Sequence, residues 1–170
     1  IVRQMPLHDK NWFATGGAAE FYAAPKTALE FQEAIRFAHA HNLSITMLGQ
    51  GANCLISDAG IKGLVIQPQL RSISFGQNGL VTADAGATMQ ELIEACLAHN
   101  LIGLEEFSGI PGTVGGSVFI NLHYFEFLLS QFLVSAQVMH KKTGDIIEVG
   151  NNWFAFGYNT STLHHAPYYL

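Results

Sequence analysis

Basic residues and long apolar runs are both scarce in this 170-residue chain. Lys and Arg together number 8, against 13 Asp and Glu, which gives a formal net charge of −5. Without a basic cluster, nucleic acid is not an expected partner. The apolar runs are interrupted well short of the ~20 residues that a membrane-spanning helix needs. No secretory signal pattern is present either, so we expect a cytoplasmic protein that does not bind a membrane.

Cysteine is also rare. The two cysteines, Cys54 and Cys96, match no metal-ligand or redox spacing. We therefore expect two free thiols, no metal site and a reducing compartment.

Charged residues make up only 12% of the chain, whereas hydrophobic residues make up 49%. This is an apolar composition for a water-exposed domain. It suggests that a ligand, a partner or a further domain covers part of the surface.

A glycine-rich turn follows the apolar run Ile45–Leu48. Gly49, Gly51 and Ala52 lie close together in it, and nothing bulkier than Gln or Asn stands before Cys54. Such a turn can present several backbone N–H groups on one side and form an anion-binding nest. It lacks the Gly-Lys-Ser/Thr of a Walker loop and the third glycine of a dinucleotide fingerprint. We interpret it as a cradle for a phosphate or diphosphate, although many such turns are purely structural.

A second glycine-rich segment, residues 108–117, holds four glycines and a proline in ten positions. Two such segments in a short chain favour one bulky ligand with a diphosphate and flat rings. The first segment would hold the diphosphate, and the second would let the backbone approach a ring system.

The pattern between these segments predicts a mixed α+β chain. Thr27 and Thr88 each precede an amphipathic helix and have a Glu three residues on, which is the signature of a capping box. The start, residues 1–14, is predicted to be irregular, and the apolar stretch 118–133 favours neither helix nor strand. The predicted apolar helix faces are Phe31, Ala34, Ile35 and Ala38, then Leu92, Ile93, Cys96 and Leu97; the predicted strands are 20–24, 45–48 and 63–67, and the predicted hairpins span 73–83 and 134–149.

Several motifs together resemble the flavin-binding part of the UDP-N-acetylenolpyruvoylglucosamine reductase (UDP-N-acetylmuramate dehydrogenase) family. They are Thr15–Ala18, Leu48–Asp58, Gly63–Ile66, Gly86-Ala87, Gly103–Glu105 and Ser108–Asn121, in the family's order and spacing. The resemblance covers roughly residues 5–165. It implies a two-lobed α+β domain of the vanillyl-alcohol-oxidase (PCMH) type with FAD between the lobes. Lobe 1 is expected at residues 1–67 and lobe 2 at 68–170, and the family's C-terminal substrate domain is not expected in this chain.

The resemblance also implies chemistry and residues. The family uses NADPH to reduce the enolpyruvyl group of a UDP-sugar in peptidoglycan synthesis. By position, the first loop would wrap the FAD diphosphate, and the second would line the isoalloxazine and the adenosine end. The implied residues are Gly49, Gln50, Gly51, Ala52, Asn53 and Cys54, then Ser108, Ile110, Pro111, Gly112, Thr113, Gly115, Gly116 and Val118.

The chain departs from the family near the substrate. Tyr158 matches the family's aromatic residue beside the substrate, but Asn159 stands where the family has a catalytic Arg. A neutral amide cannot supply the positive charge of a guanidinium. The small residues that usually follow Asn121 are replaced by Leu122–Glu126, which we expect to crowd the site. The Ser and Glu of the family's substrate domain have no counterpart.

Alternatives to an active reductase therefore stay open. The chain could be a catalytically silent flavin-binding module, an FAD oxidase acting on another alcohol, or a glycine-rich α+β domain without a cofactor. His123, His140, His164 and His165 lie outside any recognisable catalytic constellation. We expect them to be surface or packing residues rather than catalytic bases.

Overall fold

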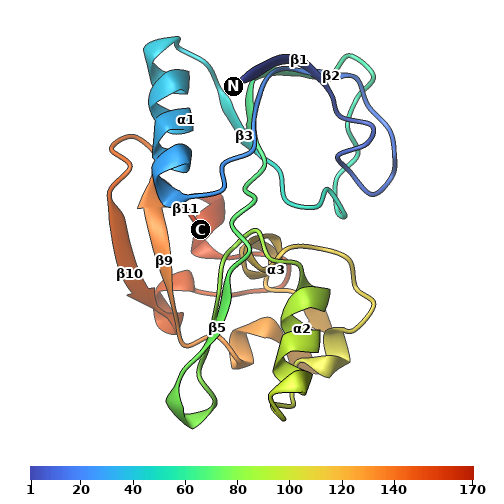
Figure 1. Cartoon of the computed structure of the whole chain (residues 1–170), viewed down its shortest axis with the longest axis vertical. Helices are drawn as coiled ribbons and strands as arrows, with labels where there is room; N and C mark the ends of the chain where they lie inside the picture. The colour runs from blue at the N-terminus through green and yellow to red at the C-terminus, as the bar shows by residue number, and fades with distance from the viewer. The chain divides into compact units, whose positions relative to one another are not determined.

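The computed structural model describes all residues from 1 to 170. The chain divides into two compact units, Ile1–Arg71 and Ser72–Leu170, which Figure 1 shows in blue to green and in green to red. None of its helices is both long enough and apolar enough to span a membrane. The FAD-binding lobes at 1–67 and 68–170 stay a prediction, because contacts rather than a ligand define these units.

A four-stranded sheet forms the centre of the first unit, in the order β1-β2-β4-β3. β2 and β3 both run parallel to β4, whereas β1 runs antiparallel to β2. The irregular start predicted for residues 1–14 is wrong in part, because five of these residues form β1. Their side chains are mostly exposed and show no alternation, so only the pairing with β2 reveals the strand. The bounds are β1 Val2–Pro6, β2 Ala18–Ala23, β3 Ile45–Met47 and β4 Ile61–Ile66.

Helix α1, Ala28–Ala40, joins β2 to β3 and begins where the sequence predicts. The Thr27 hydroxyl accepts the Glu30 N–H at 3.1 Å. The expected capping box is only half formed, because the Glu30 carboxylate accepts from the Lys26 N–H at 2.6 Å instead of from Thr27. The predicted apolar face is confirmed, since Phe31, Ala34, Ile35 and Ala38 are all buried.

The two faces of this sheet carry different partners. Phe21 of β2 meets Phe37 of α1 edge to face, with ring centroids 5.6 Å apart. Tyr22, next along β2, points to the other face, as the alternation of a strand requires. That face holds a second core of Leu7, Ala19, Tyr22, Leu48, Ile56 and Val65. The glycine loop is therefore anchored at both ends, by Leu48 and Ile56, in the core opposite α1.

In the second unit both predicted hairpins are confirmed. β5, Ile73–Phe75, pairs with β6, Val81–Ala83, around the short 3-10 turn η1, Gln77–Gly79. β9 is the central strand of a three-stranded antiparallel sheet, between β10 and β11, and Figure 1 shows β9 and β10 as adjacent arrows. Their bounds are β9 Ser135–His140, β10 Ile146–Gly150 and β11 Tyr168–Tyr169.

Helix α2, Met89–Ala98, has the complete capping box that the sequence predicts. Glu91 donates its N–H to the Thr88 hydroxyl and accepts the Thr88 N–H at 2.7 Å. The predicted apolar face is right for Leu92, Ile93 and Cys96 but wrong for Leu97, which is 47% exposed. Met89 takes its place, because a stripe through positions 89, 92, 93 and 96 already fills the face that packs on the core.

Structure also appears where the sequence indicated none. Helix α3, Val114–Ile120, begins inside the predicted loop and ends at Asn121, which adopts a left-handed conformation with φ 51°. The stretch 118–133, for which the sequence favours neither helix nor strand, therefore contains regular elements and contributes to the core of the second unit. The other elements are η2 Glu105–Phe107, β7 His123–Tyr124, β8 Phe127–Leu128, η3 Leu129–Gln131, η4 Asn151–Phe154 and η5 Thr162–His164; the core contains Met89, Ile93, Phe107, Val118, Leu122, Leu129, Val138, Val149, Phe154 and Leu163.

Candidate functional site

The first glycine-rich loop leaves the carboxyl end of β3, the end at which the strands of such sheets present ligand sites. Gly51 lies in it with φ 67°. The N–H groups of Gly51, Ala52 and Asn53 donate to no backbone carbonyl or side chain of the protein. Consecutive unpaired N–H groups around a left-handed residue form a nest that suits an anion.

Two carbonyl groups of this loop accept hydrogen bonds from residues outside it. The Gly49 carbonyl accepts from the Gln67 side-chain amide at 2.6 Å, and the Gly51 carbonyl accepts from the Trp12 N–H at 3.2 Å. Gly51 also lies directly against Asn11, because a Cβ built on Gly51 would be 2.5 Å from the Asn11 Cβ. Glycine is required here by its positive φ and by this close approach.

Asn11 in turn organises the segment from residue 7 to residue 15. Its side-chain amide donates to the carbonyls of Leu7 and Thr15, each at 2.7 Å, and its oxygen accepts the Phe13 N–H at 3.1 Å. The glycine loop thus rests on a second loop that is itself hydrogen-bonded.

Cys54 directly follows the three unpaired N–H groups along the chain and is half-buried. Burial raises the pKa of its thiol above the ordinary value. The thiol is therefore neutral at physiological pH, so it neither repels a bound phosphate nor acts as an activated nucleophile.

The second glycine-rich segment uses its N–H groups differently. Val114 and Gly115, at the start of α3, donate to the carbonyls of Ala87 and Ala85, and Gly116 donates to the Thr113 hydroxyl. A Cβ on Gly115 would be 2.9 Å from the Ala85 Cβ. These residues fasten α3 to the segment before α2 instead of offering donors to an anion.

Exposed backbone is found earlier in the segment. Ser108 and Gly109 are both exposed, and no atom lies within 4 Å of the position that a Gly109 Cβ would take. Gly109 and Gly112 have φ of 80° and 151°, so the chain needs glycine there for its backbone conformation. A flat ligand can therefore approach this backbone.

The remaining predicted residues of the segment face inward. Val118 is 2% exposed and lies in the core, so only its backbone is left for a ligand. Ile110 packs partly against the same core, and Thr113 caps α3. Pro111 is half-buried between them.

Tyr158 and Asn159 form the tip of a tight turn closed by Gly157 and Thr160. Tyr158 is 81% exposed, and its ring centroid lies 4.8 Å from that of His123. Asn159 is also exposed and has φ 54°. The turn itself therefore offers an aromatic ring and an amide, and no cation.

The bulky segment Leu122–Glu126 divides between core and surface. Leu122 is buried, whereas Tyr124 and Phe125, at the bend of the β7–β8 hairpin, are 45% and 79% exposed. Among the histidines, His164 stacks on Phe119 with centroids 3.9 Å apart, and His140 contacts the Thr143 hydroxyl at 3.1 Å. No group of three or more His, Cys, Asp or Glu side chains is arranged to hold a metal ion.

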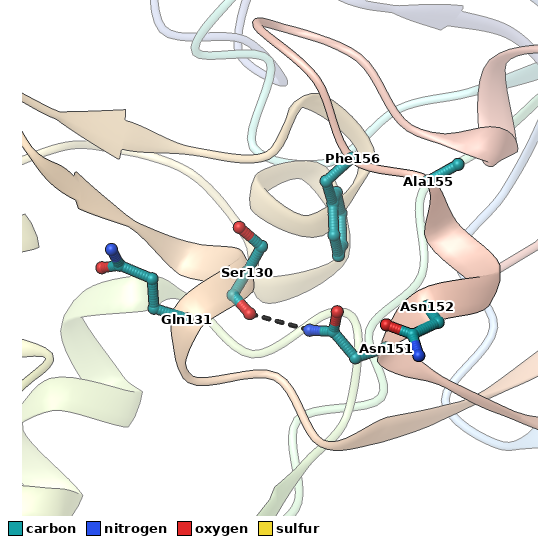
Figure 2. A pocket seen from close by; sticks show the side chains of 6 residues that line it. All are labelled: Ser130, Gln131, Asn151, Asn152, Ala155 and Phe156. Atoms are coloured by element: carbon teal, nitrogen blue, oxygen red, sulfur yellow. Dashed lines mark hydrogen bonds between the residues drawn. The ribbon is translucent and has the colours of Figure 1, made fainter.

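A separate shallow pocket of about 280 Å³ lies in the second unit. Figure 2 shows its lining of Ser130, Gln131, Asn151, Asn152, Ala155 and Phe156. The Asn151 amide donates to the carbonyls of Ser130 and Leu133, at 2.7 and 2.8 Å, so its donors are already used to join η4 to η3 and to the chain that follows it. None of the residues predicted for the ligand lines this pocket.

These features define a flavin-binding domain, and comparison with known proteins agrees. Residues 19–150 match the family model described as "FAD binding domain", and the chain belongs to this family. Its fold is the α+β fold of the vanillyl-alcohol-oxidase type. The residues present fit FAD, because the unpaired N–H groups of the first loop suit its diphosphate.

The particular relatives are UDP-N-acetylenolpyruvoylglucosamine reductases. The chain is 36% identical to that of Synechococcus sp. (strain JA-3-3Ab) over 99% of its own length and 54% of the relative. It is 40% identical to that of Trichormus variabilis over 96% of its length and 50% of the relative. The crystal structure of the Thermus caldophilus enzyme superposes with a TM-score of 0.77 at 25% identity, covering 95% of this chain and 56% of that one. The chain spans about half the length of the curated relatives it matches.

Sequence reasoning missed the residues behind the first loop. Gln67, Tyr22 and Asn11 hold the loop or its support, but none belongs to a glycine-rich motif. One signal was available, since Gln67 is a polar residue directly after the apolar run of β4 and is only 8% exposed. A buried amide needs hydrogen-bond partners, so a polar residue at this position indicates a contact with a neighbouring segment.

Proposed function

We propose that this chain is the FAD-binding part of an NADPH-dependent reductase of UDP-N-acetylenolpyruvoylglucosamine, acting in the cytoplasm in peptidoglycan synthesis. The main support is the unpaired donor set of Gly51, Ala52 and Asn53 at the carboxyl end of β3. The identity to such reductases over nearly the whole chain supports the substrate class. The neutral free thiols Cys54 and Cys96 suit a reducing compartment.

In this proposal the first loop binds the FAD diphosphate through its backbone. N–H groups donate to phosphate oxygens, and such bonds to an ionised acceptor are the stronger kind. The open backbone at Ser108 and Gly109 takes part of the ring system or the adenosine. The bound flavin supplies the hydride-transfer chemistry, and the protein supplies position and electrostatics.

At the substrate end, Tyr158 offers a ring and Asn159 offers an amide. These groups can hydrogen-bond and stack but cannot neutralise a carboxylate or a diphosphate. A UDP-sugar would therefore need its countercharge from elsewhere. The exposed aromatic side chains Tyr124, Phe125 and Tyr158 support a second element of the proposal, that a partner or further domain covers this surface.

A second candidate is a catalytically silent flavin-binding module. The neutral, exposed Asn159 favours it, because the turn lacks the cation that the family has at this position. Both candidates require FAD, so they differ only in what happens after the flavin is bound.

Flavin binding is tested first. Purified protein should retain flavin absorbance through gel filtration, and apo protein titrated with FAD should quench flavin fluorescence. Unquenched fluorescence together with no heat of binding at high FAD would refute both candidates.

The two candidates are then separated under anaerobic conditions. FAD-loaded protein is mixed with NADPH, bleaching of the flavin is followed, and UDP-N-acetylenolpyruvoylglucosamine is added. Reoxidation by the substrate at roughly 1–10³ s⁻¹ identifies an active reductase. Bleaching without substrate-dependent reoxidation is expected both of the silent module and of an FAD-binding part tested apart from the rest of a reductase, so Asn159→Arg then tests whether a restored cation recovers substrate binding.

A further inference from the structure

A buried polar network lies beneath the glycine loop. Gln67 directly follows β4, and the alternation of the strand places its side chain on the same face as Val65, in the core opposite α1. Its amide nitrogen donates to the Gly49 carbonyl at 2.6 Å and to the Lys10 carbonyl at 3.3 Å. Its oxygen accepts the Tyr22 hydroxyl at 2.6 Å. Gln67 thus joins the sheet to the glycine loop and to the loop beneath it.

Chemistry determines which way the Gln67 amide faces. The Gly49 and Lys10 carbonyls only accept hydrogen bonds, so the nitrogen must face them and the oxygen must face Tyr22. Tyr22 then has to donate. Burial, and secondarily the charge of Asp9, raises the pKa of Tyr22, so the hydroxyl keeps its proton throughout the physiological range.

The geometry of the peptide bond links the direction of the Gly49 carbonyl to the direction of the next N–H group. In a trans peptide the C=O and the following N–H point in opposite directions, and every peptide in this chain is trans. Because Gln67 holds the Gly49 carbonyl inward, the N–H of Gln50 is directed away from the sheet. Trp12 holds the Gly51 carbonyl in the same manner and directs the N–H of Ala52 outward.

We propose that Gln67, backed by Tyr22, is a positioning residue that presets the glycine loop for a diphosphate by holding the Gly49 carbonyl inward. The proposal rests on the proposed function, since the diphosphate is that of FAD. Gln67 does not touch the ligand in this arrangement. It holds the first carbonyl of the loop whose Gly51, Ala52 and Asn53 N–H groups do, and this removes a conformational cost from binding.

Gln67→Leu removes the side-chain donor while keeping similar bulk. We expect FAD to bind this variant about tenfold more weakly, the loss that one hydrogen bond of average strength would cause. Gln69→Leu, two residues further along, is the matched control and should bind FAD like the wild type. The backbone amide resonances of Gln50 and Ala52 should shift in the ligand-free Gln67→Leu protein and not in the control.

Gln67→Glu gives a second readout that a merely structural role would not move. The carboxyl group that this substitution introduces can donate to the Gly49 carbonyl when it is protonated, whereas the ionised form cannot. Relative to wild type, the FAD affinity of Gln67→Glu should therefore improve as the pH is lowered. Gln67→Leu should show no such recovery. Gln67→Glu also keeps the acceptor for Tyr22, so it provides the test if Gln67→Leu fails to fold.

The outcomes separate this inference from the proposed function. If wild-type protein does not bind FAD, the proposed function fails. If wild type binds FAD and Gln67→Leu binds it equally well, or if Gln67→Glu follows the pH dependence of the wild type, the positioning role is wrong while flavin binding stands. A lower melting temperature with an unchanged dissociation constant would likewise reduce Gln67 to a packing residue.

Discussion

The side-chain amide of Asn121 donates to the carbonyl of Gly157 at 3.2 Å. Its oxygen accepts the Ser130 N–H, also at 3.2 Å. Asn121 is 4% exposed and ends α3 with φ 51°. One residue thereby fixes the end of α3, the turn that carries Tyr158 and Asn159, and the start of η3.

Asn121→Ala should lower the free energy of unfolding by about 1–3 kcal/mol, because it leaves the half-buried Ser130 N–H without a partner and removes the shorter of two hydrogen bonds to the half-buried Gly157 carbonyl. Asn159→Ala is the matched control. Asn159 has nearly the same φ, 54°, but is exposed, so both variants share the cost of placing Ala in a left-handed conformation. Urea denaturation of both proteins isolates the hydrogen bonds. Equal destabilisation would show that the contacts of Asn121 contribute nothing.

Gly51→Ala should damage the nest, because the new Cβ would overlap Asn11 and would sit at positive φ. We expect a loss of about 1–3 kcal/mol of stability together with weaker FAD binding. Gly51→Val should have the larger effect. Gly150→Ala is the control, since its Cβ meets no atom within 4 Å and its φ is not positive. Thermal melts and FAD titrations give the two readouts, and a Gly51→Ala protein that matches Gly150→Ala in both would contradict the close packing of Gly51 against Asn11.

Phe125→Gly should stabilise the protein. Phe125 is 79% exposed and has φ 49°, a conformation that L-residues other than Asn and Asp rarely adopt. Relief of this strain should raise the free energy of unfolding by up to about 1 kcal/mol. Tyr158→Gly is the comparison, because Tyr158 is 81% exposed and has no positive φ. Glycine there should only lower the free energy of unfolding, because it increases the freedom of the unfolded backbone. A stabilised Tyr158→Gly, or a destabilised Phe125→Gly, would argue against the strain.

Stability should fall as the pH rises above 9.0, the ordinary pKa of a thiol. Burial raises the pKa of Cys54 and of Cys96 in the folded protein, so the unfolded chain loses these protons at lower pH than the native state does. The stabilisation is complete below the ordinary value and is lost as the pH rises through the folded value. Urea unfolding between pH 7 and pH 10.5 measures the decline. Cys54→Ser should flatten it, and an unchanged slope would mean that the Cys54 thiol does not contribute.

Much of the secondary structure could be predicted because its signals are local. The faces of α1 and α2 follow from helical periodicity, and the capping at Thr27 and Thr88 follows from residues three positions apart. β1 could not be predicted, because its exposed residues gain their structure only by pairing with β2. α3 was hidden because its first turn contains Gly115 and Gly116, which read locally as a loop.

The site divides in the same way. The glycines of both segments were visible in the sequence, since a positive φ and a close approach both demand glycine. The supporting contacts were not visible, because Gln67 and Asn11 meet the loop across long separations in the chain. The Arg-to-Asn difference at Asn159 could be read only against the family pattern, and no rule of local structure would have indicated it.

The contact between Gly51 and Asn11 links two stretches of chain far apart in sequence. Trp12 and Asn11 hold the glycine loop, and the loop holds them in return. A ligand that binds only the closed loop lowers the population of conformations in which the loop and the segment from residue 7 to residue 15 open together. Binding therefore also stabilises that segment. Trypsin should therefore cut the peptide bond after Lys10, in the middle of this segment, more slowly when the nest is occupied than when it is empty.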